Sequence, residues 1–122
     1  MNIKTIESNG TTVAVICEQT PVLTDVSSAL DLLATVRYET GCDRIALPKE
    51  ALCEDFFVLS TRLAGEILQK FINYQAKFAV FGDFSGYTSK ALHDFIYESN
   101  QGKDVFFVST EEEAVQRLAA AR

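Results

Sequence analysis

The chain has 122 residues, of which 48% are apolar and nine are Phe, and its formal net charge is −6 at pH 7. This composition excludes a disordered tail, and the length predicts a single domain over residues 1–122. The acidic balance, with Lys and Arg scattered singly, argues against binding to nucleic acid or to an anionic membrane surface.

The first half of the chain predicts a hairpin, a helix and a strand. Residues 3–7 and 11–18 are rich in β-forming side chains and flank Asn9-Gly10, the strongest short hairpin signal. Apolar residues recur at helical spacing over 25–40, and Gly41 ends that pattern. We expect a buried strand over 44–47, ended by Pro48.

The second half predicts two further strands and three helices. The apolar pattern of residues 56–74 predicts the longest helix, with a wide apolar arc. Residues 78–81 and 104–108 form apolar strands, and 87–97 resumes helical spacing. Thr110 is a natural N-cap for the last helix, whose first turn is acidic.

The resulting order, ββαβαβαβα, predicts an α/β fold with an antiparallel N-terminal hairpin and four parallel strands. Both faces of these strands are apolar, so both need cover. If the helices lay mostly on one side, a second protomer would cover the other, which predicts a homodimer. Ligand sites in such sheets lie at the carboxyl ends of the strands, here residues 17–24, 48–55, 82–86 and 109–110.

The most polar of these loops is residues 82–90, where Asp83, Ser85, Tyr87 and Ser89 are candidate binding residues. Backbone N–H groups and hydroxyls there could hold an anion or a small ligand. The loop lacks the Walker and dinucleotide spacings, and its hydroxyls could instead be ordinary N-caps. Both interpretations stay open.

Catalytic chemistry has little support. Ser85 or Ser89 with His93 and Asp83 would be the hydrolase candidates, but no GxSxG elbow is present, so we assign no catalytic residue. We also expect no metal and no cofactor, because no His or Cys pair has ligand spacing.

The cysteines and the N-terminus point to the cytoplasm. Cys17, Cys42 and Cys53 are odd in number and include no CxxC pair, which is typical of reduced thiols. No secretory signal or membrane-spanning run is recognisable. We expect a soluble cytoplasmic protein of bacterial type.

Arg62 and Asn73 are candidates for a partner surface on the predicted long helix. Arg62, Glu66 and Lys70 recur at four-residue steps, which is also the pattern of a solvated face. Because the apolar arc beside them is broad, the face could instead meet a partner.

The element order resembles that of the STAS domains, the anti-sigma-factor antagonist fold. Members of that family are phosphorylated on Ser or Thr after the third strand, but residues 47–55 here contain no hydroxyl side chain, so the switch does not carry over. Residues 55–74, 82–85, 89–92 and 95–100 resemble the bacterial family named domain of unknown function 4180, which implies a fold and a cytoplasmic setting but no activity.

The leading hypothesis is therefore a non-catalytic regulatory or protein-interaction module that forms a homodimer. A small-ligand or anion-binding domain at the strand ends is the alternative, and a small hydrolase is the third. The regulatory hypothesis uses Asp83, Ser85 and Arg62, and the ligand hypothesis uses Ser85, Tyr87 and Ser89.

Overall fold

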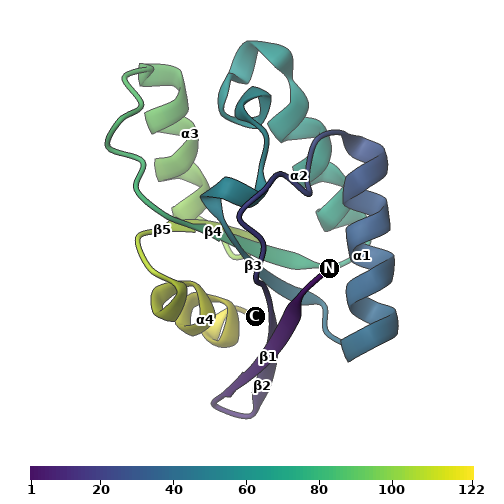
Figure 1. Cartoon of the computed structure of the whole chain (residues 1–122). Helices are drawn as coiled ribbons and strands as arrows, with labels where there is room; N and C mark the ends of the chain where they lie inside the picture. The colour runs from purple at the N-terminus through teal and green to yellow at the C-terminus, as the bar shows by residue number, and fades with distance from the viewer.

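One five-stranded sheet forms the centre of the protein (Figure 1). The computed structural model describes all 122 residues, Met1–Arg122. β1 pairs antiparallel with β2, and all other neighbouring strands are parallel, which confirms the predicted α/β order. The strands, in their order across the sheet, are β1 (Ile3–Ser8), β2 (Thr11–Ile16), β3 (Arg44–Pro48), β4 (Lys77–Phe81) and β5 (Val105–Val108).

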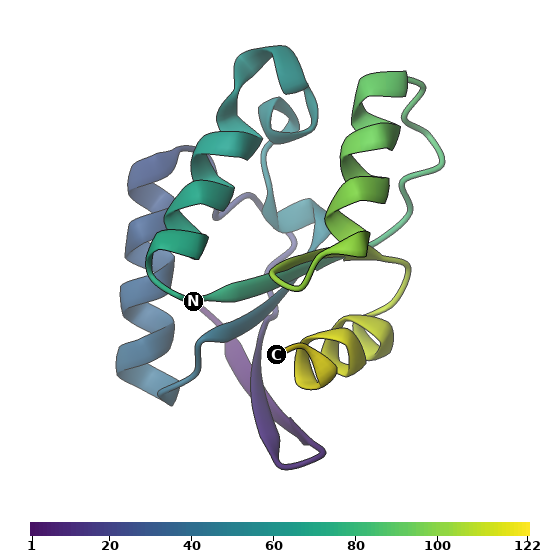
Figure 2. The same cartoon turned by 180° about the vertical axis from the view of Figure 1, so that it is seen from behind.

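Helices of the chain itself cover both faces of this sheet. Three helices lie over one face and α4 crosses the other (Figures 1 and 2). The larger core has 24 buried residues, including Phe71 and Phe78, and the smaller has nine, including Ala79 and Leu118. The helices are α1 (Val26–Thr40), α2 (Leu63–Asn73), α3 (Lys90–Gln101) and α4 (Glu111–Ala120). None of them is both long enough and apolar enough to cross a bilayer.

This arrangement removes one of the two reasons for predicting a homodimer, namely an uncovered face of the sheet; the other reason was the wide apolar arc of residues 56–74. The face opposite α1, α2 and α3 is not bare, because α4 packs against residues of β2, β3, β4 and β5 in the smaller core. A second protomer is therefore not needed to bury the sheet.

Basic side chains from the sheet hold both ends of α4. Lys4 pairs with Glu111 in the first turn at 2.9 Å. At the other end, the Arg44 guanidinium donates to the carbonyl oxygen of Ala121 at 2.7 Å, and the Lys77 ammonium lies 3.2 Å from that of Arg122. Glu111 in the first turn, and Arg44 and Lys77 at the other end, have the signs that suit the helix dipole, whereas Lys4 acts through its pair with Glu111. These contacts add to the apolar packing of α4 against the sheet.

The predicted helix over residues 56–74 is wrong at its start. Residues 54–57 and 59–61 form 3₁₀ turns, Arg62 adopts a left-handed conformation with φ of 66°, and α2 begins only at Leu63. At 15 residues α1 is longer than α2, which has 11. The apolar spacing predicts a helix here because the 3₁₀ turn at residues 54–57 also buries apolar side chains, those of Phe56 and Phe57.

This backbone conformation makes a test possible at Arg62. A left-handed residue with a side chain costs about 1 kcal/mol relative to Gly, so Arg62→Gly is expected to be more stable than Arg62→Ala by about that amount. Urea unfolding of the two variants measures the difference. If residues 56–74 were one helix, Ala would instead be the more stable residue at this position, by about 1 kcal/mol.

Candidate functional site

The loops that follow β3, β4 and β5 meet at the carboxyl-terminal edge of the sheet, where ligand sites of parallel sheets are found. Two hollows open there. The first lies between the 3₁₀ turns after β3 and the start of α3, and the second lies over the ends of β4 and β5.

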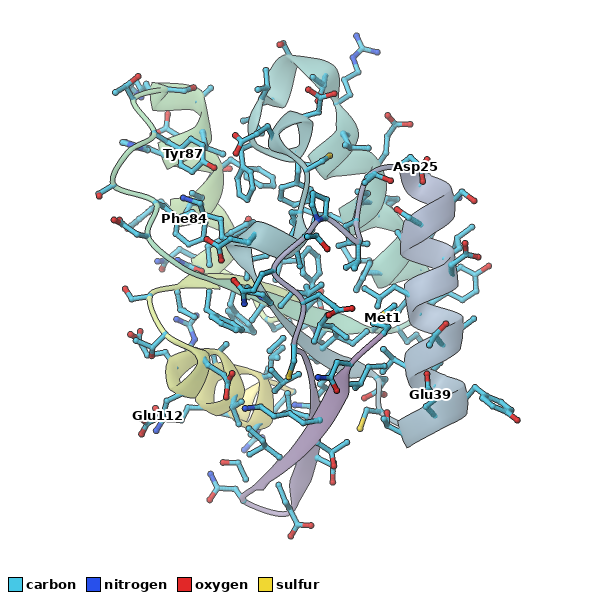
Figure 3. The ribbon with its side chains drawn as sticks, in the orientation of Figure 1. Met1, Asp25, Glu39, Phe84, Tyr87 and Glu112 are labelled. Atoms are coloured by element: carbon cyan, nitrogen blue, oxygen red, sulfur yellow. The ribbon has the colours of Figure 1, made fainter.

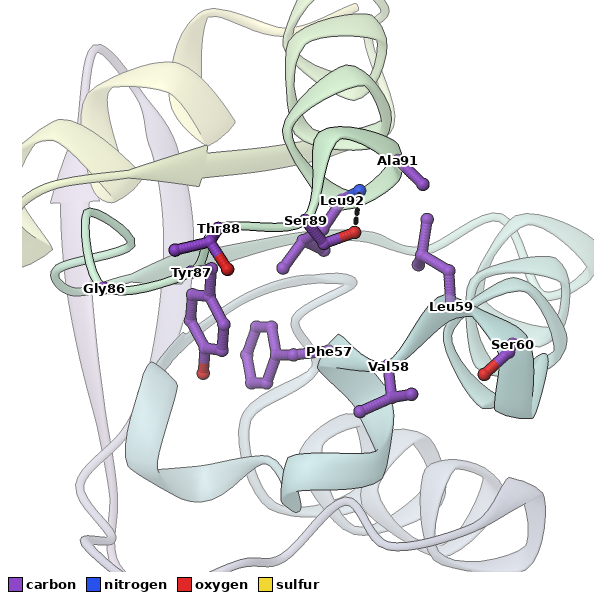
Figure 4. Close-up of a pocket in the computed structure, with 10 residues that line it drawn as sticks. All are labelled: Phe57, Val58, Leu59, Ser60, Gly86, Tyr87, Thr88, Ser89, Ala91 and Leu92. Carbon is purple, nitrogen blue, oxygen red and sulfur yellow. Dashed lines mark hydrogen bonds between the residues drawn. The ribbon is translucent and has the colours of Figure 1, made fainter.

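The first hollow, which we call the Phe57 hollow, has a volume of about 450 Å³ (Figure 4). The rings of Phe57 and Tyr87 stack at 5.1 Å between centroids. No charged side chain lines it. Its lining residues are Phe57, Val58, Leu59, Ser60, Gly86, Tyr87, Thr88, Ser89, Ala91 and Leu92.

The aromatic pair belongs to a larger cluster that joins the loop to the core. The ring of Phe84 lies 6.1 Å from that of Phe57 and 5.8 Å from that of Phe107 on β5. Phe57 also meets the buried Phe56 edge to face at 5.2 Å. These contacts give the Phe57 hollow a wall that is fixed by core packing.

Lys49 connects the end of β3 to the loop after β4. Its ammonium donates to the Asp83 carbonyl oxygen at 2.8 Å and lies 4.9 Å from the centre of the Tyr87 ring. Gly82 permits this approach, because a Cβ there would lie 2.9 Å from Lys49 Cβ and because its φ is 155°. The loop therefore needs glycine at this position.

The second hollow, of about 460 Å³, is lined by residues 82–85 and 107–109. Asp83 lies at its rim and accepts a hydrogen bond from the Ser85 N–H at 2.9 Å. The Ser85 side chain, then its amide, and the nearby Lys49 charge lower the pKa of the Asp83 carboxyl. A negative charge is therefore held at this rim.

The six candidate binding residues from the sequence analysis lie at different places in the structure. Tyr87 and Ser89 line the Phe57 hollow, and Asp83 and Ser85 line the second one. Arg62 is exposed just before α2, and Asn73 lies about 15 Å farther along that helix. Arg62 and Asn73 thus lie at opposite ends of α2 and share no surface.

The hydrolase candidates do not form a catalytic arrangement. His93 Nε2 lies 2.5 Å from the Tyr87 carbonyl oxygen, so this nitrogen carries the proton and donates it. Ser89 Oγ caps α3 by accepting from the Leu92 N–H at 3.2 Å. The His93 backbone N–H donates to the Ser89 carbonyl oxygen at 3.1 Å, but no hydrogen bond joins a serine hydroxyl to the His93 ring. No group of three His, Cys, Asp or Glu side chains is placed to hold a metal ion.

Sequence reasoning missed Lys49 and the wall formed by residues 57–60. The apolar spacing predicts a helix over those four residues. The dipeptide Ser60-Thr61 could have indicated a turn in place of a helix, because Ser and Thr side chains often bond to nearby backbone groups in turns. Thr61 Oγ1 lies 2.7 and 2.8 Å from the carbonyl oxygens of Asp55 and Val58, which stabilises the turn.

The environment of Tyr87 predicts a pH effect. Burial, followed by the charges of Glu54 and Glu50, raises the pKa of the Tyr87 hydroxyl. The unfolded chain therefore loses this proton first, so the contribution of Tyr87 to stability is complete below about pH 10 and falls as the pH rises through the folded-state pKa. We expect Tyr87→Phe to lose stability less steeply than the wild type between about pH 9 and about pH 11.

Urea unfolding across that pH range measures the two slopes. Tyr97→Phe is the matched control, because the Tyr97 side chain is 67% exposed on α3, and it is expected to retain the slope of the wild type. Equal slopes for Tyr87→Phe and the wild type would contradict this role of Tyr87.

Comparison with known proteins identifies a family. No curated protein and no solved structure matches the chain. A family model described as a domain of unknown function (DUF4180) matches residues 8–118, which confirms the resemblance noted in the sequence. Because this match spans nearly all of the chain, the protein belongs to the DUF4180 family.

Proposed function

We propose that this protein is a non-catalytic, regulatory protein-interaction module whose Phe57 hollow receives an apolar or aromatic side chain of a partner protein. The observation that carries the proposal is the lining of this hollow: an aromatic wall, no charged side chain, and a serine already bonded to the helix that it caps. A group that binds there gains mainly from burial of apolar surface.

A partner side chain fits this lining better than a free small molecule does. Pockets for small molecules carry a few placed polar groups that orient the ligand. Ser89 is already engaged as the cap of α3, and the other polar side chains of the lining are the hydroxyls of Ser60, Tyr87 and Thr88, with no charged or carboxamide group among them. Val58, which lines the hollow and is 48% exposed, adds apolar surface at its rim, where a protein partner would cover it.

The anion-binding alternative has less support at the second hollow. Asp83 holds a negative charge at the rim, because its pKa is lowered by its hydrogen bonds from Ser85. A bound anion would meet that charge at short range. The Lys49 ammonium, the nearest positive group, is already engaged with the Asp83 carbonyl oxygen.

Self-association and a cytoplasmic setting also belong to this proposal. Tyr74 lines an apolar groove of about 300 Å³ between α1 and α2, together with Leu30, Leu33, Ala34 and Arg37. Because Tyr74 is 51% exposed beside this groove, we propose that two copies meet there. Light scattering on the purified chain is expected to give the mass of a dimer, and the mass of a monomer would contradict self-association.

Ala91→Arg tests the proposed site, because Ala91 is exposed and lines the Phe57 hollow at the start of α3. A long charged side chain there is expected to reduce recovery of a partner protein from lysate of the native host by at least about tenfold. Ala120→Arg is the control, since Ala120 is exposed at the end of α4, and it should retain the partner.

Quantitative mass spectrometry of tagged wild-type and variant proteins provides the measurement. Equal recovery of every protein with Ala91→Arg and Ala120→Arg would contradict a partner site at this hollow. A small molecule, bound to the wild type in native mass spectra and lost in Ala91→Arg, would instead support the ligand-binding alternative.

A further inference from the structure

The two edge strands of the sheet differ in whether their outward backbone groups are hydrogen-bonded. At the β5 edge, the Asn100 side chain donates to the Phe107 carbonyl oxygen at 3.0 Å and accepts from the Phe107 N–H at 2.8 Å. Its carboxamide thus replaces one residue of a neighbouring strand. Such capping prevents pairing with another chain.

The β1 edge has no such cap. Cys17 N–H donates to the Asn2 carbonyl oxygen at 2.8 Å, so even-numbered residues of this strand bond to β2. Ile3, Thr5 and Glu7 therefore direct their N–H and C=O groups away from the sheet, and no hydrogen bond outside the ladder uses them. The hairpin also projects beyond the helices (Figure 1).

A hollow of about 280 Å³ lies beside this edge, between the end of β1 and the first turns of α4. Ile6 and Val115 contribute apolar surface, and Glu111 and Glu112 contribute carboxylates. Figure 3 shows Glu112 on the outer side of α4, and Glu111 is paired with Lys4. Glu112 takes part in no ion pair.

We propose that the β1 edge binds an extended segment of a partner protein as a sixth strand, with a Lys or Arg of that segment beside Glu112. An added strand would bond to the outward groups of Ile3, Thr5 and Glu7. Because side chains alternate between the faces of a strand, every second one would lie on the α4 side, over this hollow.

Charge favours a basic segment over a second copy of this chain. Two copies joined through β1 by a two-fold axis would place both α4 helices on the same face of the extended sheet. The acidic turns Glu111–Glu113 of both copies would then lie on that same face, which would carry like charges. A basic strand places opposite charges there, and this surface shares no residue with the Phe57 hollow.

The test uses the isotope-labelled full chain and two acetylated peptides, Thr-Val-Lys-Val-Lys-Val-Thr and its counterpart with Glu in place of Lys. We expect the Lys peptide to shift the amide NMR signals of Ile3, Thr5 and Glu7 and to bind at least about tenfold more tightly than the Glu peptide. Thr5→Pro is expected to abolish binding, since it removes an outward N–H without breaking a bond to β2.

A pair of charge variants makes the test independent of Thr5→Pro. Glu112→Lys is expected to reverse the preference between the peptides, and Glu113→Lys, in the same turn but outside the hollow, should leave it unchanged. Equal binding of both peptides, shifts confined to other strands, or a wild-type chain that dimerises through β1 without peptide would each overturn the proposal.

Discussion

The structure depends on a sheet that is apolar on both faces and must be covered on both. The chain meets this need with three helices on one face and a single helix on the other. Because α4 is alone on its face, its position depends on the buried apolar residues Ala114, Val115 and Leu118, and the contacts of Lys4, Arg44 and Lys77 at its ends add to that packing. With both faces closed, surfaces for binding are left at the margins of the sheet, and the Phe57 hollow and the β1 edge both lie there.

The Phe57 hollow exists because the backbone between β3 and α2 is not helical throughout. The left-handed Arg62 and the 3₁₀ turns before it carry the chain from β3 to α2 without a long helix. A helix starting at Phe56 would have placed residues 57–60 on a helical surface, whereas the turns bury Phe57 against Tyr87 and leave Val58 exposed. The same segment thus fills the core with one face and forms a wall of the hollow with the other.

The strands, their directions and the caps of α1 and α4 could be predicted from sequence because each has a local cause. Asn9-Gly10 specifies the hairpin, and Asp25 and Thr110 accept the N–H groups that open their helices. Helical spacing from residue 87 predicts the start of α3 too early, because Ser89 caps a helix that begins at Lys90. The loop after β4 was also found, because its position follows from the strand order. The wall formed by residues 57–60 could not be predicted, since apolar spacing is similar in a helix and in consecutive 3₁₀ turns. That α4 packs on the opposite face from the other three helices could not be predicted either, because the apolar periodicity of a helix does not indicate which face of a sheet it covers.

Photo-crosslinking from the rim of the Phe57 hollow, in the native host, tests whether a partner protein binds there. A benzophenone amino acid at Val58 is compared with one at Tyr38, an exposed position on α1. A partner site at this hollow predicts a covalent adduct with a distinct protein from Val58 that is absent from Tyr38 and disappears when Ala91→Arg is added. The same adducts from both positions, or none from Val58, would contradict a partner site at this hollow.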